Sequence, residues 1–99
     1  MDTEWQFEWD ETKDQKNQKK HSVSFKEATD IFFDPLQRNI LDVRYDDGEE
    51  RWITIGATKG HKILVVGHLY DISADGTESI RIISARPATK KEITQYENT

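Results

Sequence analysis

The sequence contains no cysteine, only three histidines and two prolines, and no long apolar run. Without cysteine the chain forms no disulfide and offers no thiolate, so a structural zinc site would depend on histidines and carboxylates alone. His61 and His68 show no ligand-like spacing, and we predict neither a metal nor a cofactor. No apolar stretch approaches the ~20 residues that cross a bilayer, and the acidic start is unlike a signal peptide. We therefore expect a cytoplasmic protein that contacts no membrane.

The chain has 99 residues, which is enough for one hydrophobic core and too few for two. Hydrophobic residues make up 34% of the chain and charged residues 33%, so the core is small, yet Trp, Phe and Ile are more frequent than in disordered proteins. We expect a single folded domain over residues 1–99, with loose ends at 1–4 and 97–99.

The net charge of −5 argues against a protein that coats nucleic acid through its overall field, because such domains are usually basic. The charge is unevenly distributed, however. Residues 1–12 contain five acids and no base, whereas residues 13–26 contain five lysines and one aspartate. The lysine-rich segment fits either a local basic surface or a solvated helix face.

Two periodicities describe the first third of the chain. Large aromatic residues alternate with polar ones from Glu4 to Trp9, which predicts a strand with one buried face. Residues 10–20 favour a helix but contain almost no apolar side chain, so this helix should lie on the surface. Ser24 and Glu27 form a capping-box pattern, and the apolar spacing after them predicts a second helix that ends at 34–35.

Strand-like alternation dominates the rest of the chain. We predict strands around 41–45, 53–55, 63–66 and 80–85, separated by turns at 46–48, 58–60 and 75–76. Pro87 suits the first turn of a closing helix, in which Ile93 and Tyr96 share one face. The order of elements predicts an α+β fold made of a strand, two helices, a four-strand antiparallel meander and a C-terminal helix.

Three arginines in or beside the predicted strands are candidates for binding a phosphate, because a guanidinium donates paired hydrogen bonds and stays charged. Arg51 opens one strand. Arg81 lies inside the last strand between isoleucines, where its charge needs water, a carboxylate or a ligand, so a salt bridge is the alternative to a functional role. Arg86 precedes the closing helix, where a phosphate would also meet exposed amides, although a residue that simply enters a helix is the alternative.

Lys20 and His21 stand between the two predicted helices. An imidazole titrates near pH 6.5 and can accept or donate a proton, and an adjacent ammonium favours its neutral form. A packing or capping role is the alternative for His21. No glycine-rich phosphate loop, nucleophile elbow or HExxH metal motif is present.

The aromatic residues have two readings as well. Trp5, Trp9 and Trp52 could stack RNA bases, but a chain with so few large apolar residues needs them in its core. Phe25 and Phe32 have the helical spacing of core residues.

Three sequence blocks, at 20–25, 50–56 and 81–89, carry a resemblance that covers nearly the whole chain. In order and spacing they resemble the BrnT family, small bacterial ribonuclease toxins of toxin–antitoxin pairs. Matching positions outside the blocks are Phe7 to Asp10, Lys13, Asn17, Glu27, Ala28, Phe32, Asp34, Pro35, Leu64 to Val66, Glu92 and Tyr96.

The resemblance implies a compact fold similar to the RelE group of toxins, and an endoribonuclease that cleaves RNA without a metal and halts translation. It also implies a BrnA-like antitoxin with a ribbon-helix-helix DNA-binding region, a complex of two toxins and two antitoxins, and contact with DNA only through the antitoxin. Cleavage by internal attack requires deprotonation of the 2′-hydroxyl, neutralisation of the phosphate and protonation of the 5′-oxygen. We assign the phosphate to Arg51, Arg81 and Arg86, and assistance in proton transfer to Lys20 and His21.

Two departures from the family pattern leave a second hypothesis open. Ser22 stands where relatives commonly have glycine, in a turn that tolerates positive φ. The segment from Gly67 to Ile72 contains no arginine, although relatives often carry one there. Loss of a cationic contact weakens RNA binding. The alternative is therefore an attenuated toxin that acts mainly as an antitoxin-binding module in a DNA-binding repressor complex.

Overall fold

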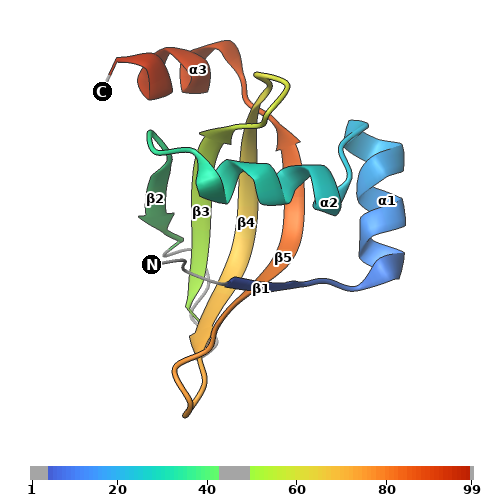
Figure 1. Cartoon of the computed structure of the whole chain (residues 1–99). Coiled ribbons are helices and arrows are strands. Elements are labelled where there is room, and N and C mark those ends of the chain that lie inside the picture. Colours follow the sequence, from blue (N-terminus) through green and yellow to red (C-terminus); the bar gives the residue numbers. More distant parts are fainter. Residues whose placement is uncertain (1–4, 43–49, 99) are drawn as a thin grey trace.

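The computed structural model describes residues 5–42 and 50–98. Within these ranges, five strands form one mixed sheet in the order β1-β5-β4-β3-β2, and three α-helices and one 3₁₀ helix surround it (Figure 1). The predicted α+β class is confirmed. The predicted four-strand antiparallel meander does not match this sheet, because the first strand joins it as a fifth member.

The pairing of the strands makes the sheet mixed. β1 (Trp5–Glu8) runs parallel to β5 (Glu78–Pro87). The remaining pairs are antiparallel: β5 with β4 (Ile63–Ile72), β4 with β3 (Arg51–Ala57), and β3 with β2 (Arg38–Leu41). Aromatic alternation in β1 correctly indicated a strand, but such a pattern carries no information about which neighbour the strand pairs with or in which direction.

One face of the sheet is covered by α2 (Phe25–Ala28) and the 3₁₀ helix η1 (Thr29–Phe33), which cross it as one continuous segment (Figure 1). The predicted helix is confirmed over 25–28 and continues to its expected end before 34–35, but its second half is a 3₁₀ helix and not an α-helix. Gly56 of β3 explains how closely η1 approaches, because a Cβ there would lie 2.9 Å from Cβ of Ile31. The core between these layers consists of Val23, Phe25, Ala28, Ile31, Phe32, Leu64, Val66, Ile80, Ile82 and Ala85.

The aromatic predictions are confirmed for most residues. Phe25 and Phe32 are buried, and Trp5 and Trp9 pack against the same core. Trp52 is only half-buried.

The opposite face of the sheet is covered at one end by α3 (Lys90–Glu97), whose buried Tyr96 packs against Ile55 and Val65. Pro87 is the last residue of β5 and not part of this helix, so its predicted place was wrong. Thr89 caps the helix instead and forms a reciprocal capping box with Glu92. The other end of this face is not covered by α3.

Helix α1 (Glu11–His21) stands beside the edge of β5 (Figure 1) and is attached by polar side chains. Asp14 accepts a hydrogen bond from the backbone N–H of Phe25 at 2.8 Å. The Asn17 amide donates to the carbonyls of Val23 and Ala85 at 2.9 and 2.7 Å, and accepts from the Ala85 N–H at 3.2 Å. The helix lies at the surface, as its composition predicted, yet two of its polar residues are buried anchors.

Several terminal and loop predictions fall wholly or partly outside the described residues. These are the loose start at 1–4, the second half of the strand at 41–45, the turn at 46–48, and Thr99. Of the predicted loose end, Glu97 closes α3 and Asn98 donates its N–H to the Thr94 carbonyl at 3.0 Å. In the described ranges, no helix is long and apolar enough to cross a membrane.

Candidate functional site

Three of the predicted site residues, His21, Arg51 and Arg86, line a single pocket of about 250 Å³. The pocket lies on the face of the sheet that also carries α3. Gly67 and Ser84, which are paired across β4 and β5, contribute to its lining. A Cβ on Gly67 would lie only 2.7 Å from Oγ of Ser84, so the absence of a side chain at position 67 keeps this part of the pocket open.

The register of the strands sets which arginines share this face. Arg51 lies directly opposite Leu69, and Leu69 lies directly opposite Arg81. Directly paired residues project to the same face, and two interstrand spacings separate the outer residues by about 10 Å. Arg51 and Arg81 are therefore neighbours on one surface.

A β-bulge brings Arg86 to the same face. Five positions separate Arg81 from Arg86, an odd number that in a regular strand would send their side chains to opposite faces. The pairing of β4 and β5 shifts between Gly67 and His68, so that Gly67 opposes Ser84 whereas His68 opposes Ile82. The extra residue, Ile83, restores the alternation, and both arginines project toward the same side.

His21 reaches the pocket because it is the last residue of α1 and the chain turns sharply after it. Ser22 follows with φ 59° and ψ 29°, and its N–H bonds to the Gln18 carbonyl at 2.9 Å. This left-handed conformation costs a serine roughly 1–2 kcal/mol but is adopted here without glycine. Lys20, by contrast, is exposed and does not line the pocket.

The guanidinium of Arg86 is held by a carboxylate from α3. Its Nη1 and Nη2 donate to Oε1 and Oε2 of Glu92 at 2.8 and 2.9 Å, and Nη1 also donates to the Pro87 carbonyl at 3.3 Å. These bonds from Arg86 lower the pKa of Glu92 to about 2. The pair is therefore ionised near neutral pH, and Arg86 lines the pocket while bound to Glu92.

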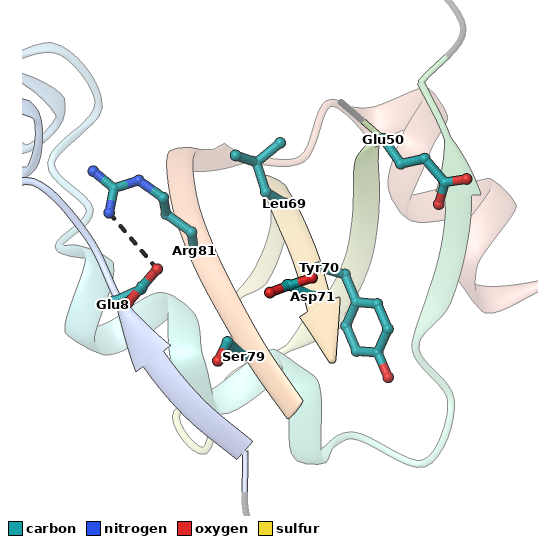
Figure 2. A pocket seen from close by; sticks show the side chains of 7 residues that line it. All are labelled: Glu8, Glu50, Leu69, Tyr70, Asp71, Ser79 and Arg81. Carbon is teal, nitrogen blue, oxygen red and sulfur yellow. Dashed lines mark ion pairs between the residues drawn. The ribbon is translucent and has the colours of Figure 1, made fainter. Parts of the chain in front are cut away.

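Arg81 lines a second, larger pocket of about 460 Å³ on the same surface (Figure 2). Its Nη1 lies 3.7 Å from Oε1 of Glu8, an ion pair that provides the salt bridge named as the alternative to a functional role. The other lining residues are Glu50, Leu69, Tyr70, Asp71 and Ser79.

Charge distinguishes the two pockets as sites for a phosphate. The larger pocket has three carboxylates and one guanidinium, whereas the smaller has two guanidinium groups and one carboxylate among its described lining residues. Glu92, which binds Arg86 from outside the lining, offsets part of this positive charge. An anion is therefore repelled less by the second arrangement than by the first. The pocket lined by His21, Arg51 and Arg86, hereafter the arginine pocket, is therefore the better candidate.

The carboxylate of the arginine pocket belongs to Asp42, which is not among the predicted site residues. Asp42 is buried, and its N–H donates to the Arg51 carbonyl at 2.7 Å just beyond the end of β2. No motif marks this position in the sequence. Only the pairing of β2 with β3 places it beside Arg51.

His68 lies on the other face of the sheet, away from the arginine pocket. It is 5% exposed, its Nε2 lies 2.8 Å from Oγ1 of Thr54, and its ring meets Phe32 edge-on. Burial lowers the pKa of His68 to about 4, which keeps the ring neutral near pH 7. In residues 5–42 and 50–98, no cluster of three or more His, Asp or Glu side chains is arranged to hold a metal ion.

Comparisons with known proteins agree with the fold and the sequence blocks. Residues 9–92 match the family described as the ribonuclease toxin BrnT of type II toxin–antitoxin systems. The crystal structure of the Brucella abortus ribonuclease toxin BrnT, at 1.1 Å resolution, is similar with a TM-score of 0.63 and 21% identity. The similarity covers 88% of this chain and 100% of that one, and at this identity it shows the fold alone. No curated protein matches the chain.

Proposed function

Because the chain belongs to the BrnT family of ribonuclease toxins of type II toxin–antitoxin systems, we propose that it is an endoribonuclease that cleaves RNA without a metal ion and thereby inhibits translation. The observation that carries this proposal is the arginine pocket, in which two guanidinium groups and an imidazole line one small hollow. Cleavage of a phosphodiester needs cationic groups for the phosphate and at least one group that moves protons near neutral pH.

In the proposed reaction the ribose 2′-oxygen attacks the adjacent phosphorus. His21 accepts the 2′-hydroxyl proton as the P–O2′ bond forms, and the P–O5′ bond breaks. Arg51 and Arg86 bind the non-bridging oxygens, where negative charge accumulates in the transition state. Water donates a proton to the departing 5′-oxygen, and His21 then releases the proton it accepted to the solvent, which leaves a 2′,3′-cyclic phosphate and a 5′-hydroxyl.

Arg81 and Lys20 have supporting places in this proposal. Arg81 lies about 10 Å from Arg51 across β4, at a distance suited to a neighbouring phosphate of the same strand. Lys20 is exposed one residue before His21 and would contact the backbone where it leaves the arginine pocket. Both would contribute to RNA affinity more than to the chemical step.

Cleavage of a defined oligonucleotide tests the proposal. The purified chain should cut an RNA oligonucleotide in the presence of EDTA, and a 2′-deoxy substitution at the cleaved position should abolish the cut. His21→Ala and Arg86→Ala should each lower the rate by about 10²–10³-fold, as removal of a general base or of a transition-state contact does. Lys16→Ala, which removes an exposed cation on α1 outside the pocket, is the matched control.

The same variants can be compared in cells. Induced expression of the wild type in a bacterial host should arrest growth and create new 5′ ends in total RNA that are missing with Arg86→Ala. An intact RNA pool and normal growth would contradict the ribonuclease proposal.

A second function is favoured by Leu69, which occupies the position between Arg51 and Arg81 where a cation would complete the surface. No arginine occurs in 67–72. This arrangement supports an attenuated toxin that serves mainly to bind its antitoxin. Such a chain would bind antitoxin and leave RNA intact, and Leu69→Arg would then be expected to increase RNA affinity.

The proposed partner is a BrnA-like antitoxin with a ribbon-helix-helix region, since a type II toxin is neutralised by a protein. We expect a complex of two toxins and two antitoxins in the cytoplasm, which contacts DNA through the antitoxin alone, and a toxin fold related to the RelE group. Co-expression with the product of a neighbouring small gene, followed by native mass spectrometry, would establish the stoichiometry.

A further inference from the structure

We propose that Glu92 is a positioning residue of the arginine pocket, which holds the guanidinium of Arg86 in the orientation that binds the scissile phosphate. This inference rests on the proposed ribonuclease function and extends it to a residue on α3. Glu92 does not line the pocket, so it acts through Arg86 and not on the substrate.

The two side chains form an ion pair with two parallel hydrogen bonds, hereafter the clamp. Both carboxylate oxygens of Glu92 accept bonds from separate nitrogens of Arg86, at 2.8 and 2.9 Å. Oε1 also accepts from the backbone N–H of Thr89 at 2.8 Å, which fixes the carboxylate itself. Two parallel bonds to a planar fork leave the guanidinium little freedom to rotate.

The carboxylate is in turn fixed to the rest of the fold. The Ala88 N–H donates to the Ile63 carbonyl of β4 at 2.9 Å, just before α3 begins. At the other end of the helix, Arg38 donates to the Gln95 carbonyl at 3.1 Å, and the Tyr96 hydroxyl donates to Asp34. Helix α3 is attached at both ends, so the position of Glu92 is set by the sheet.

A clamp of this kind matters because an arginine side chain has many rotamers. A free arginine must lose that freedom when it binds a phosphate, whereas a side chain ordered beforehand does not. Arg51 adds a second positive charge to the arginine pocket. Charge alone does not orient a guanidinium, however, so each guanidinium depends on neighbouring groups for its orientation. Transition-state stabilisation by a donor depends on its placement before the reaction.

The negative charge of Glu92 has a separate and opposite effect. It partly offsets the charge of Arg86 and weakens ground-state attraction of the phosphate. Removing the charge should therefore leave substrate binding equal or stronger while chemistry slows. A lower kcat with an unchanged or lower KM distinguishes positioning from simple loss of binding.

The test compares two variants at the two positions of the capping box of α3. Glu92→Gln is isosteric and retains a residue suited to the capping box, but its amide nitrogen cannot accept from Arg86. Thr89→Ala removes the other half of the cap and leaves the clamp intact. Melting temperature, kcat and KM on one RNA oligonucleotide are measured for both variants and for the wild type, well below the melting transition.

We expect Glu92→Gln to lower kcat about tenfold without raising KM, and Thr89→Ala to lower the melting temperature while leaving kcat unchanged. Equal losses of kcat in the two variants would show that Glu92 only stabilises α3 and would overturn the inference. A rise in kcat for Glu92→Gln would also overturn it, because Glu92 would then act only as an anion that competes with the phosphate for Arg86. If the wild type cleaves no RNA, the proposed function fails and this role with it; if the wild type cleaves and Glu92→Gln matches its kcat, only the role of Glu92 fails.

Discussion

Replacement of Asn17 by alanine should lower the free energy of unfolding by about 3–4 kcal/mol, far more than is usual for a polar residue on a surface helix. Asn17 makes three hydrogen bonds in a buried setting, two of them with the backbone of Ala85, which lies on the β5 edge beyond the residues that pair with β1. The side chain thus substitutes for a neighbouring strand beyond the end of β1.

The magnitude follows from those bonds. Each is worth roughly 1 kcal/mol net, which gives about 3 kcal/mol for the set. Ala85 is fully buried, so its orphaned N–H and carbonyl add about 1 kcal/mol or more of desolvation. Alanine has a higher helix propensity than asparagine, which offsets roughly 0.5 kcal/mol of this loss of stability. The total is a large part of the 5–15 kcal/mol that stabilises typical domains.

Urea unfolding followed by tryptophan fluorescence measures this loss as a shift of the transition midpoint at constant slope. Lys16→Ala, one position away on the exposed side of α1, is the control and should change stability by less than about 0.5 kcal/mol. A loss below about 1 kcal/mol for Asn17→Ala would refute the reasoning, because it would mean that packing and not these polar bonds attaches α1. Because α1 carries His21, a variant that still folds should also cleave RNA more slowly.

Three further outcomes follow from local geometry. Ser22→Gly should stabilise the fold by about 0.5–1 kcal/mol, seen as a higher melting temperature, because glycine adopts the φ of 59° without strain. Gly56→Ala should destabilise it by about 1–3 kcal/mol in urea, because the new Cβ would meet the Ile31 carbonyl at 3.0 Å, whereas Gly60→Ala meets nothing closer than 3.7 Å and should be nearly neutral. Burial lowers the pKa of His68 from 6.5 to about 4, so the unfolded chain binds a proton in this range that the folded chain does not. Stability should therefore be greatest above pH 6.5 and fall by about 2 kcal/mol between pH 7 and 5, a loss that unfolding curves of His68→Gln should not show.

The predictions from local pattern were accurate where a single periodicity governed the segment. Aromatic alternation identified β1, the capping pattern at Ser24 identified α2, and Phe25 and Phe32 were placed in the core. They were less accurate where two conformations compete. The segment after Ala28 continues as a 3₁₀ helix, and it approaches β3 closely at Gly56, a contact between distant parts of the chain that local pattern does not show.

The polar attachments of α1 could not be inferred from sequence. The spacing of apolar residues reveals only the apolar face of a helix. Residues 10–20 contain almost no apolar residue, so this spacing predicts a helix that is solvated on all sides. Asp14 and Asn17 are nevertheless buried, because each reaches a backbone group that only the packed fold places beside it. A polar residue has no pattern that reveals whether its partner is water or a buried amide.

The sequence by itself determined the chemistry that is available: no thiol, an α+β pattern of elements, three strand-associated arginines, and the family blocks around them. The tertiary structure alone decided how these groups meet. The bulge at Ile83 put Arg81 and Arg86 on one face, the strand pairing brought Asp42 to the pocket, and the fold of α3 gave Arg86 its partner Glu92. The physical reason is that side-chain identity is local, whereas strand register and helix docking depend on contacts between residues far apart in the chain.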